Sequence, residues 1–123
     1  MKIAPPEFEK LVADALTTIP KELRAHIDNV QIVIEDEPDD ELLSDLGVPP
    51  DETLFGLYEG TPLTERTTQY SAFPDRIVIF RKPLLEAFDD PREIRREVAR
   101  TVIHEIAHHF GIDEDRLTAL GWD

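Results

Sequence analysis

The chain has 123 residues, of which 41% are hydrophobic and 33% are charged. This length fits one domain, residues 1–123, and the composition is that of a folded globular protein rather than a disordered one. The net charge of -14, from 27 acidic against 13 basic residues, repels phosphate backbones and anionic lipids, so neither a nucleic acid nor a membrane is expected as a partner.

The first half of the chain predicts helices followed by strands. Apolar residues recur at helical spacing over residues 7–16, just after two prolines, and residues 21–27 predict a second, shorter helix. Residues 30–34 are rich in β-branched side chains and predict a strand. The acidic segment 39–50 predicts a loop with a short helical turn. Residues 53–58 predict another strand, interrupted by Gly56.

The second half contains one more strand and the longest helix. Residues 61–73 are polar and long enough to form a functional loop. Residues 76–80 predict the third strand, residues 83–88 a helical turn and residues 114–120 a last short helix. This order of helix, strands and helices predicts an α+β domain.

The longest helix has clear end signals at both termini. Asp90 is a suitable N-cap, Pro91 fits the first helical position, and Glu93 completes a capping-box pattern. Gly111 can adopt the left-handed conformation that ends a helix. Between these ends, an apolar stripe at helical spacing is expected to pack on the sheet: Ile94, Val98, Val102, Ile103, Ile106, Ala107 and Phe110.

This helix contains His104-Glu105-Ile106-Ala107-His108. Residues four apart lie one turn above each other, so His104 and His108 can share one tetrahedral ion, and imidazole nitrogen suits Zn²⁺. Glu105 lies about 100° around the helix from His104, beside the ion. There its carboxylate can act as general base for a water that the metal activates. Two exposed histidines on a helix are the structural alternative.

A third ligand is needed, and the acidic residues after Gly111 are the nearest candidates. The stretch from His104 reads H-E-I-A-H-H-F-G-I-D-E, which matches the extended zincin pattern with Glu114 in the ligand position. Asp113 and Asp115 remain alternatives, and Asp113 also suits the N-cap of the final helix. The only methionine is Met1, so the methionine turn of metzincins is absent.

The chain resembles the family of small bacterial zincin-like metallopeptidases, sometimes described as minimal zincins. The likeness runs through residues 55–60, 74–78 and 104–122. The resemblance implies a minimal zincin core: a small mixed sheet of about three strands packed on an N-terminal helix and the long helix, with a short C-terminal helix. It also implies bound zinc and a peptidase activity. The family usually has aspartate where this chain has Glu114.

Several other polar residues have weaker indications of a role. The phenols of Tyr58 and Tyr70 could stabilise the oxyanion of a tetrahedral intermediate, although both residues also suit packing. His109 points about 100° away from His108 and is expected at the surface or around the metal ligands. Glu97 lies two turns before His104 on the same side of the helix, where a solvated face is the simpler interpretation.

These features predict a zinc-dependent peptidase that hydrolyses peptide bonds by metal-activated water. In zincins an extended peptide pairs with an exposed sheet edge, so residues 53–60, or the loop up to residue 73, are expected to border the peptide or protein substrate. The alternative is a zinc-binding interaction module with little or no proteolysis, and an iron site is a third possibility. The peptidase is preferred because a purely structural site has no use for Glu105.

The cellular compartment is predicted from three features that are missing from the sequence: cysteine, a membrane-spanning run and a signal peptide. Cysteine is absent, so neither a disulfide framework nor a thiolate metal site is available. No apolar run is long enough to span a bilayer, and the first residues do not have the apolar core of a signal peptide. We therefore expect a cytoplasmic protein. The sequence leaves its oligomeric state open.

Overall fold

The computed structural model describes residues 2–28, 30–49, 53–60 and 75–122. Its sheet contains β1 (Val30–Glu35), β2 (Gly56–Glu59) and β3 (Asp75–Phe80) in the order β1-β3-β2. β1 runs parallel to β3, and β2 runs antiparallel to it. The expected small mixed sheet is thus confirmed, and β2 is one of its edge strands.

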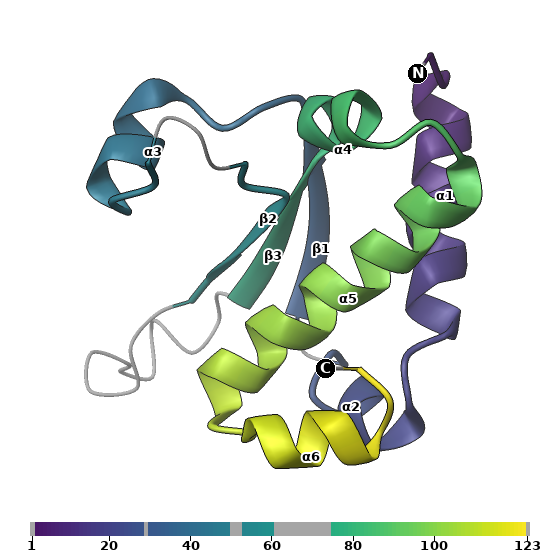
Figure 1. Cartoon of the computed structure of the whole chain (residues 1–123), viewed down its shortest axis with the longest axis vertical. Coiled ribbons are helices and arrows are strands. Elements are labelled where there is room, and N and C mark those ends of the chain that lie inside the picture. The colour runs from purple at the N-terminus through teal and green to yellow at the C-terminus, as the bar shows by residue number, and fades with distance from the viewer. Residues whose placement is uncertain (1, 29, 50–52, 61–74, 123) are drawn as a thin grey trace.

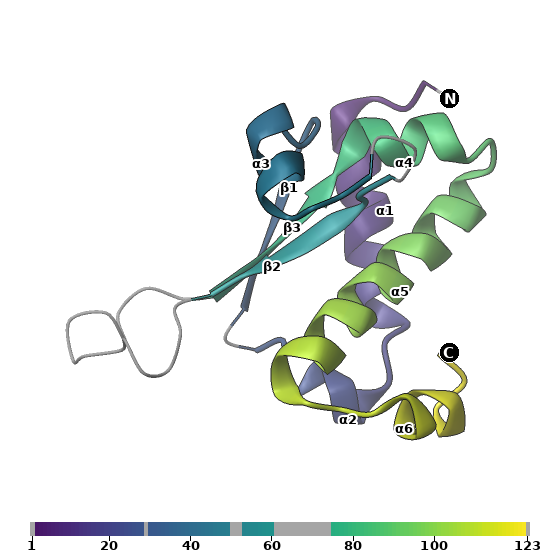
Figure 2. The ribbon, with the colours of Figure 1, turned by 60° about the vertical axis from the view of Figure 1, so that its left-hand side comes forward.

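Two helices cover one face of this sheet, α1 (Pro5–Thr17) and α5 (Pro91–Phe110). Figure 2 shows both helices on the same side of the three strands. α5 contacts α1 and also β2 and β3. The expected packing of the sheet on an N-terminal helix and a long helix is therefore confirmed.

Short helices lie at the two ends of the sheet (Figures 1 and 2). At one end are α3 (Asp40–Asp45) and α4 (Arg81–Ala87). At the other are α2 (Lys21–Arg24) and the C-terminal helix α6 (Glu114–Ala119). Arg116 of α6 forms an ion pair with Glu22 of α2, so these two helices are in direct contact.

The core fills the space between α1, α5 and the sheet. Its fully buried side chains come from one stripe on each helix and from alternate positions of β3, as amphipathic packing requires: Phe8, Val12, Ala15, Ile77, Ile79, Ile94, Val98, Val102, Ile103 and Ile106. Phe110 was expected in this stripe, and that prediction is wrong. Its side chain is 44% exposed and its ring contacts His26 at a centroid distance of 4.5 Å.

The N-cap Asp90 and the end at Gly111 form as the local chemistry predicts, but Asp90 caps the Arg92 amide and the capping box expected with Glu93 does not form between these two residues. The Asp90 carboxylate accepts a hydrogen bond from the Arg92 amide at 2.9 Å, which satisfies a free N–H of the first turn. At the other end Gly111 has a φ of 70°, and the Ile112 amide donates to the Ala107 carbonyl at 2.9 Å. This is a common helix C-terminus, in which a glycine in the left-handed conformation lets the chain reverse direction.

Two predicted elements differ from the structure by three residues at one end, and the others differ by one or two residues or agree. The strand expected over residues 53–58 begins only at Gly56 and ends at Glu59, because residues 53 and 54 line grooves instead of pairing with β3. The helix expected over residues 21–27 ends at Arg24, since the following amides, from His26 and Ile27, bond three residues back in a tighter turn. The polar stretch 61–73 lies outside the described residues. In the described ranges no helix has both the length and the apolarity needed to cross a membrane.

Candidate metal centre and the groove beside it

His104, Glu105 and His108 lie in the last two turns of α5. His104 and Glu105 are partly buried, whereas His108 is exposed. His104 and Glu105 form part of the wall of a groove of about 470 Å³ between α5 and the segment that enters β2. The other residues along this groove are Leu54, Phe55, Gly56, Glu97, Arg100 and Thr101. Leu54, Phe55 and Gly56 belong to residues 53–60, which the sequence predicts to border the substrate.

His104 has a nitrogen atom that suits a metal ion. Its Nε2 is buried and has no hydrogen-bond partner in the part of the chain that the structure describes. A buried polar atom normally has a partner, because leaving it without one costs about 1–3 kcal/mol. A neutral imidazole nitrogen is a common ligand of Zn²⁺. The donor chemistry at His104 therefore fits a metal ion.

The third ligand remains a prediction. Within the described ranges, no three histidine or carboxylate side chains are gathered closely enough to hold an ion. Glu114 and Asp115 are exposed in the first turn of α6. Asp113 is the N-cap of that helix, because its carboxylate accepts a hydrogen bond from the Arg116 amide at 2.8 Å. The structure thus confirms the capping role that was the alternative for Asp113.

Glu105 contacts the edge strand directly. Its Oε2 accepts a hydrogen bond from the main-chain amide of Tyr58 at 3.0 Å. The two residues are 47 positions apart in sequence. Main-chain groups of an edge strand alternate between its neighbour and the open side, and the Tyr58 amide lies on the open side. The carboxylate of α5 therefore satisfies a donor on the side of β2 that faces away from β3.

Gly56 allows α5 and β2 to approach each other this closely. A Cβ atom at Gly56 would lie 2.6 Å from the Thr101 Cγ2 atom and 3.0 Å from the Val78 carbonyl oxygen. Real Cβ contacts are essentially never as short as the first of these. The glycine that the sequence presents as an interruption is therefore a point where strand and helix approach each other closely.

The phenol of Tyr58 has a different partner from the one expected. Its hydroxyl donates to the Asp75 carboxylate at 2.6 Å. Since a phenol has a single proton to donate, this bond makes it unavailable to an oxyanion, and the predicted oxyanion role of Tyr58 is not supported. Tyr70 lies outside the described residues.

Glu97 is half-buried in the wall of the groove, not on a solvated helix face. Burial raises the pKa of its carboxyl, while the positive charges of Arg100 and His104 act in the opposite direction. The sequence placed Glu97 on the same side of the helix as His104. It did not indicate the burial, which arises where the segment entering β2 packs beside α5.

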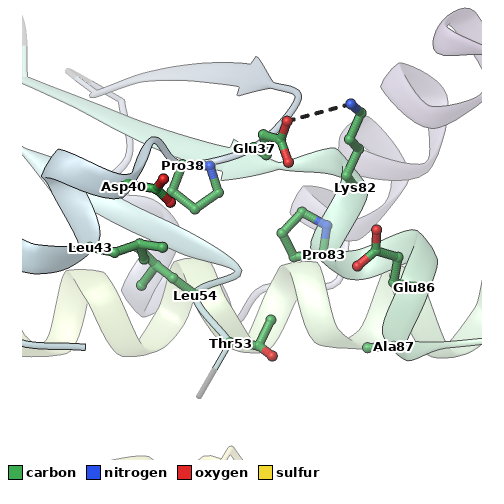
Figure 3. A pocket seen from close by; sticks show the side chains of 10 residues that line it. All are labelled: Glu37, Pro38, Asp40, Leu43, Thr53, Leu54, Lys82, Pro83, Glu86 and Ala87. Atoms are coloured by element: carbon green, nitrogen blue, oxygen red, sulfur yellow. Dashed lines mark ion pairs between the residues drawn. The ribbon is translucent and has the colours of Figure 1, made fainter. Parts of the chain in front are cut away.

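A second groove, of about 380 Å³, shares the lining residue Leu54 with the first. Figure 3 shows this second groove between α3, α4 and the segment that enters β2. Three carboxylates, from Glu37, Asp40 and Glu86, lie along it together with Lys82. The ammonium group of Lys82 is 3.5 Å from the Glu37 carboxylate. The first groove thus lies beside His104 of α5, and the second lies beside α4 at the end of the sheet.

Comparisons with known proteins agree with this architecture. A family model described as zincin-like metallopeptidase matches residues 27–122. The solved structure of a conserved hypothetical protein from Thermo thermophilus is similar, with a TM-score of 0.58 and 18% sequence identity. That alignment covers 98% of this chain and 100% of the other. At such low identity the likeness concerns the fold alone. No curated protein matches the chain in sequence.

Proposed function

Since this chain belongs to the zincin-like metallopeptidase family, we propose that it is a zinc peptidase in which His104, His108 and Glu114 bind the metal and Glu105 is the general base. The main support is the position of Glu105, which binds the Tyr58 amide of β2 in the wall of the same groove that His104 lines. A metal-binding motif without catalysis does not require a carboxylate at this place.

Each group has a defined task in the proposed hydrolysis. Zinc, when bound, polarises the scissile carbonyl and makes water more acidic. Glu105 accepts the proton of the attacking water and passes it to the departing amine. Its Oε2 is bonded to the Tyr58 amide, and a carboxylate has a second oxygen with which to accept that proton.

The side of β2 away from β3 offers a place for the substrate, next to the Tyr58 amide that Glu105 occupies. An extended peptide can pair with an edge strand through main-chain hydrogen bonds, and the groove beside β2 runs past Gly56 to Leu54. Further along, substrate side chains would reach the second groove, where Glu37, Asp40 and Glu86 favour positive charge (Figure 3). A peptide library for this protein should therefore include lysine- and arginine-rich members.

The test combines elemental analysis with a peptide-library cleavage screen on the purified protein. We expect bound zinc and cleavage by the unaltered chain. Glu105→Gln should retain zinc and lose turnover by about 10²- to 10⁴-fold, the usual contribution of a general base. His104→Ala and His108→Ala should lose zinc, whereas the control His26→Gln should retain it.

Two results would contradict the proposal. Stoichiometric zinc with no cleavage of any library peptide would favour the interaction module instead of the peptidase. Undiminished turnover by Glu105→Gln would remove Glu105 from the mechanism. Analysis of the bound element also distinguishes zinc from iron.

A further inference from the structure

Tyr58 connects three segments of the chain at the candidate site. Its main-chain amide donates to Glu105 of α5, and its hydroxyl donates to Asp75 at the start of β3. Its ring stacks on the imidazole of His109, with centroids 4.0 Å apart and planes inclined by 16°. Tyr58, Asp75 and His109 are called the Tyr58 cluster below.

The members of the Tyr58 cluster also contact one another. The Nε2 atom of His109 is 3.7 Å from the same Asp75 oxygen that accepts the Tyr58 hydroxyl. The Asp75 side chain is only 11% exposed. Tyr58 pairs with Ile77 across the sheet, so Asp75 is its diagonal neighbour on β3, a position that long aromatic side chains can reach. The ring of Tyr58 is therefore fixed from both sides, by a strand and by a helix.

Three side chains in one row along α5 contact β2. Thr101, Glu105 and His109 are spaced by four, so they lie on one side of α5. They contact, in order, Gly56, the Tyr58 amide and the Tyr58 ring. One step of four residues along a helix is about 6 Å, and one step of two residues along a strand is about 6.7 Å. The helix and the strand therefore keep the same spacing of contacts from Gly56 to Tyr58, and His109 then contacts the ring of Tyr58 itself.

From this geometry we propose that Tyr58 is a positioning residue for Glu105. The inference rests on the proposed function, since it concerns the general base of that reaction. Asp75 and His109 hold the ring of Tyr58, the ring fixes the main chain of β2, and the amide of Tyr58 fixes the orientation of the Glu105 carboxylate. Productive geometry in catalysis depends on orientation of this kind.

The alternative is that the Tyr58 cluster only packs β2 against α5. The two roles differ in what they change. A packing role lowers stability and leaves the turnover of the folded protein unchanged. A positioning role lowers kcat while KM and the zinc content stay the same, because the carboxylate acts on the chemical step and does not bind the metal.

Amide hydrogen exchange, measured by NMR on the whole protein, reports on the hydrogen bond from the Tyr58 amide to Glu105 and requires no substrate. We expect the amide at position 58 to be protected in the unaltered chain and to exchange at least 10-fold faster in Glu105→Ala, which removes the acceptor. Tyr58→Leu, which removes the stack and the hydroxyl, should accelerate the same amide by a similar factor. Tyr58→Phe keeps the stack and should give an intermediate rate. Phe88→Leu is the matched control, because it removes a ring that packs on Phe55, outside the Tyr58 cluster.

The kinetic measurement uses a library peptide that the unaltered chain cleaves. Tyr58→Leu should lower kcat by about 10- to 100-fold with KM within twofold and zinc content unchanged, and Tyr58→Phe should recover part of the loss. Unchanged exchange at position 58 in Tyr58→Leu would overturn the proposal, as would faster exchange with normal kcat. If the unaltered chain cleaves no peptide, the proposed function fails separately, and the exchange rates alone decide whether the cluster holds the Tyr58 amide on Glu105.

Discussion

Glu97 is half-buried beside His104, and this burial raises the pKa of its carboxyl. When the pKa of a carboxyl is higher in the folded than in the unfolded state, its protonation favours the folded state. This contribution is fully present below the unfolded pKa, about 4.3. That contribution is lost as the pH rises through the folded pKa, and above it the buried charge disfavours folding. Glu97→Gln removes this charge and should stabilise the metal-free protein at pH 7.

The expected gain is below about 1 kcal/mol, because the side chain remains partly solvated. Urea unfolding at pH 7 and at pH 4 measures it, and the gain should shrink at the lower pH, where the native carboxyl takes up its proton. Glu9→Gln, an exposed change on α1, is the control with the same loss of charge. A midpoint that is lower at pH 7 in Glu97→Gln than in the unaltered protein would contradict the prediction.

At the scale of single residues, the sequence predicted the motif but not the partner of Glu105. His104, Glu105 and His108 follow from spacing along one helix, which is a local property. The bond from the Tyr58 amide to Glu105 joins residues 47 positions apart and depends on how β2 packs on α5. A main-chain donor also has no residue type of its own, so no pattern of side chains could indicate it.

At the scale of elements, the contact between α5 and β2 depends on Gly56. Glycine to alanine at this position places a methyl group 2.6 Å from Thr101 Cγ2, so the strand or the helix must move. Overpacking of this kind typically costs about 1–3 kcal/mol. Gly56→Ala should therefore lower the free energy of unfolding by that amount, measured by urea denaturation.

A double-mutant cycle separates the clash from other effects of the alanine. Thr101→Ala removes Cγ2, so the double variant Gly56→Ala/Thr101→Ala should recover part of the lost stability. Recovery stays incomplete because the Val78 carbonyl oxygen is still 3.0 Å away. Strictly additive losses in the two single variants would show that the close contact with Thr101 is not the cause.

Element ends were predicted well where they depend on local chemistry. The start of α5 at Pro91 and its end before Gly111 follow from Asp90, Pro91 and a glycine able to adopt positive φ. The start of β2 was placed too early, because residues 53 and 54 have strand-like chemistry yet line the grooves. Phe110 continues the apolar stripe in sequence but projects past the core. Both errors concern tertiary packing, which periodicity does not report.

At the scale of the molecule, α6 connects the candidate site to the rest of the fold. Leu117 of α6 is buried in the core, and Arg116 pairs with Glu22 of α2. Glu114, the proposed third ligand, begins the same helix, on the far side of the turn at Gly111. A metal held by His104, His108 and Glu114 would therefore join α5 to α6 and, through the contacts of α6, to the N-terminal half of the chain.

Zinc should accordingly stabilise the whole chain against thermal unfolding. A ligand at 100 times its Kd that binds only the native state adds about 2.7 kcal/mol. For a chain of this length that gain raises Tm by about 10 °C. Calorimetry of the protein with zinc and with EDTA measures the shift, which should vanish in His104→Ala.

The same shift in Tm tests the third ligand. Glu114→Gln should lose most of the shift and Asp115→Asn should keep it. The two variants are a matched pair, because each removes one negative charge from neighbouring exposed positions of α6. The reverse result would assign the third ligand to Asp115.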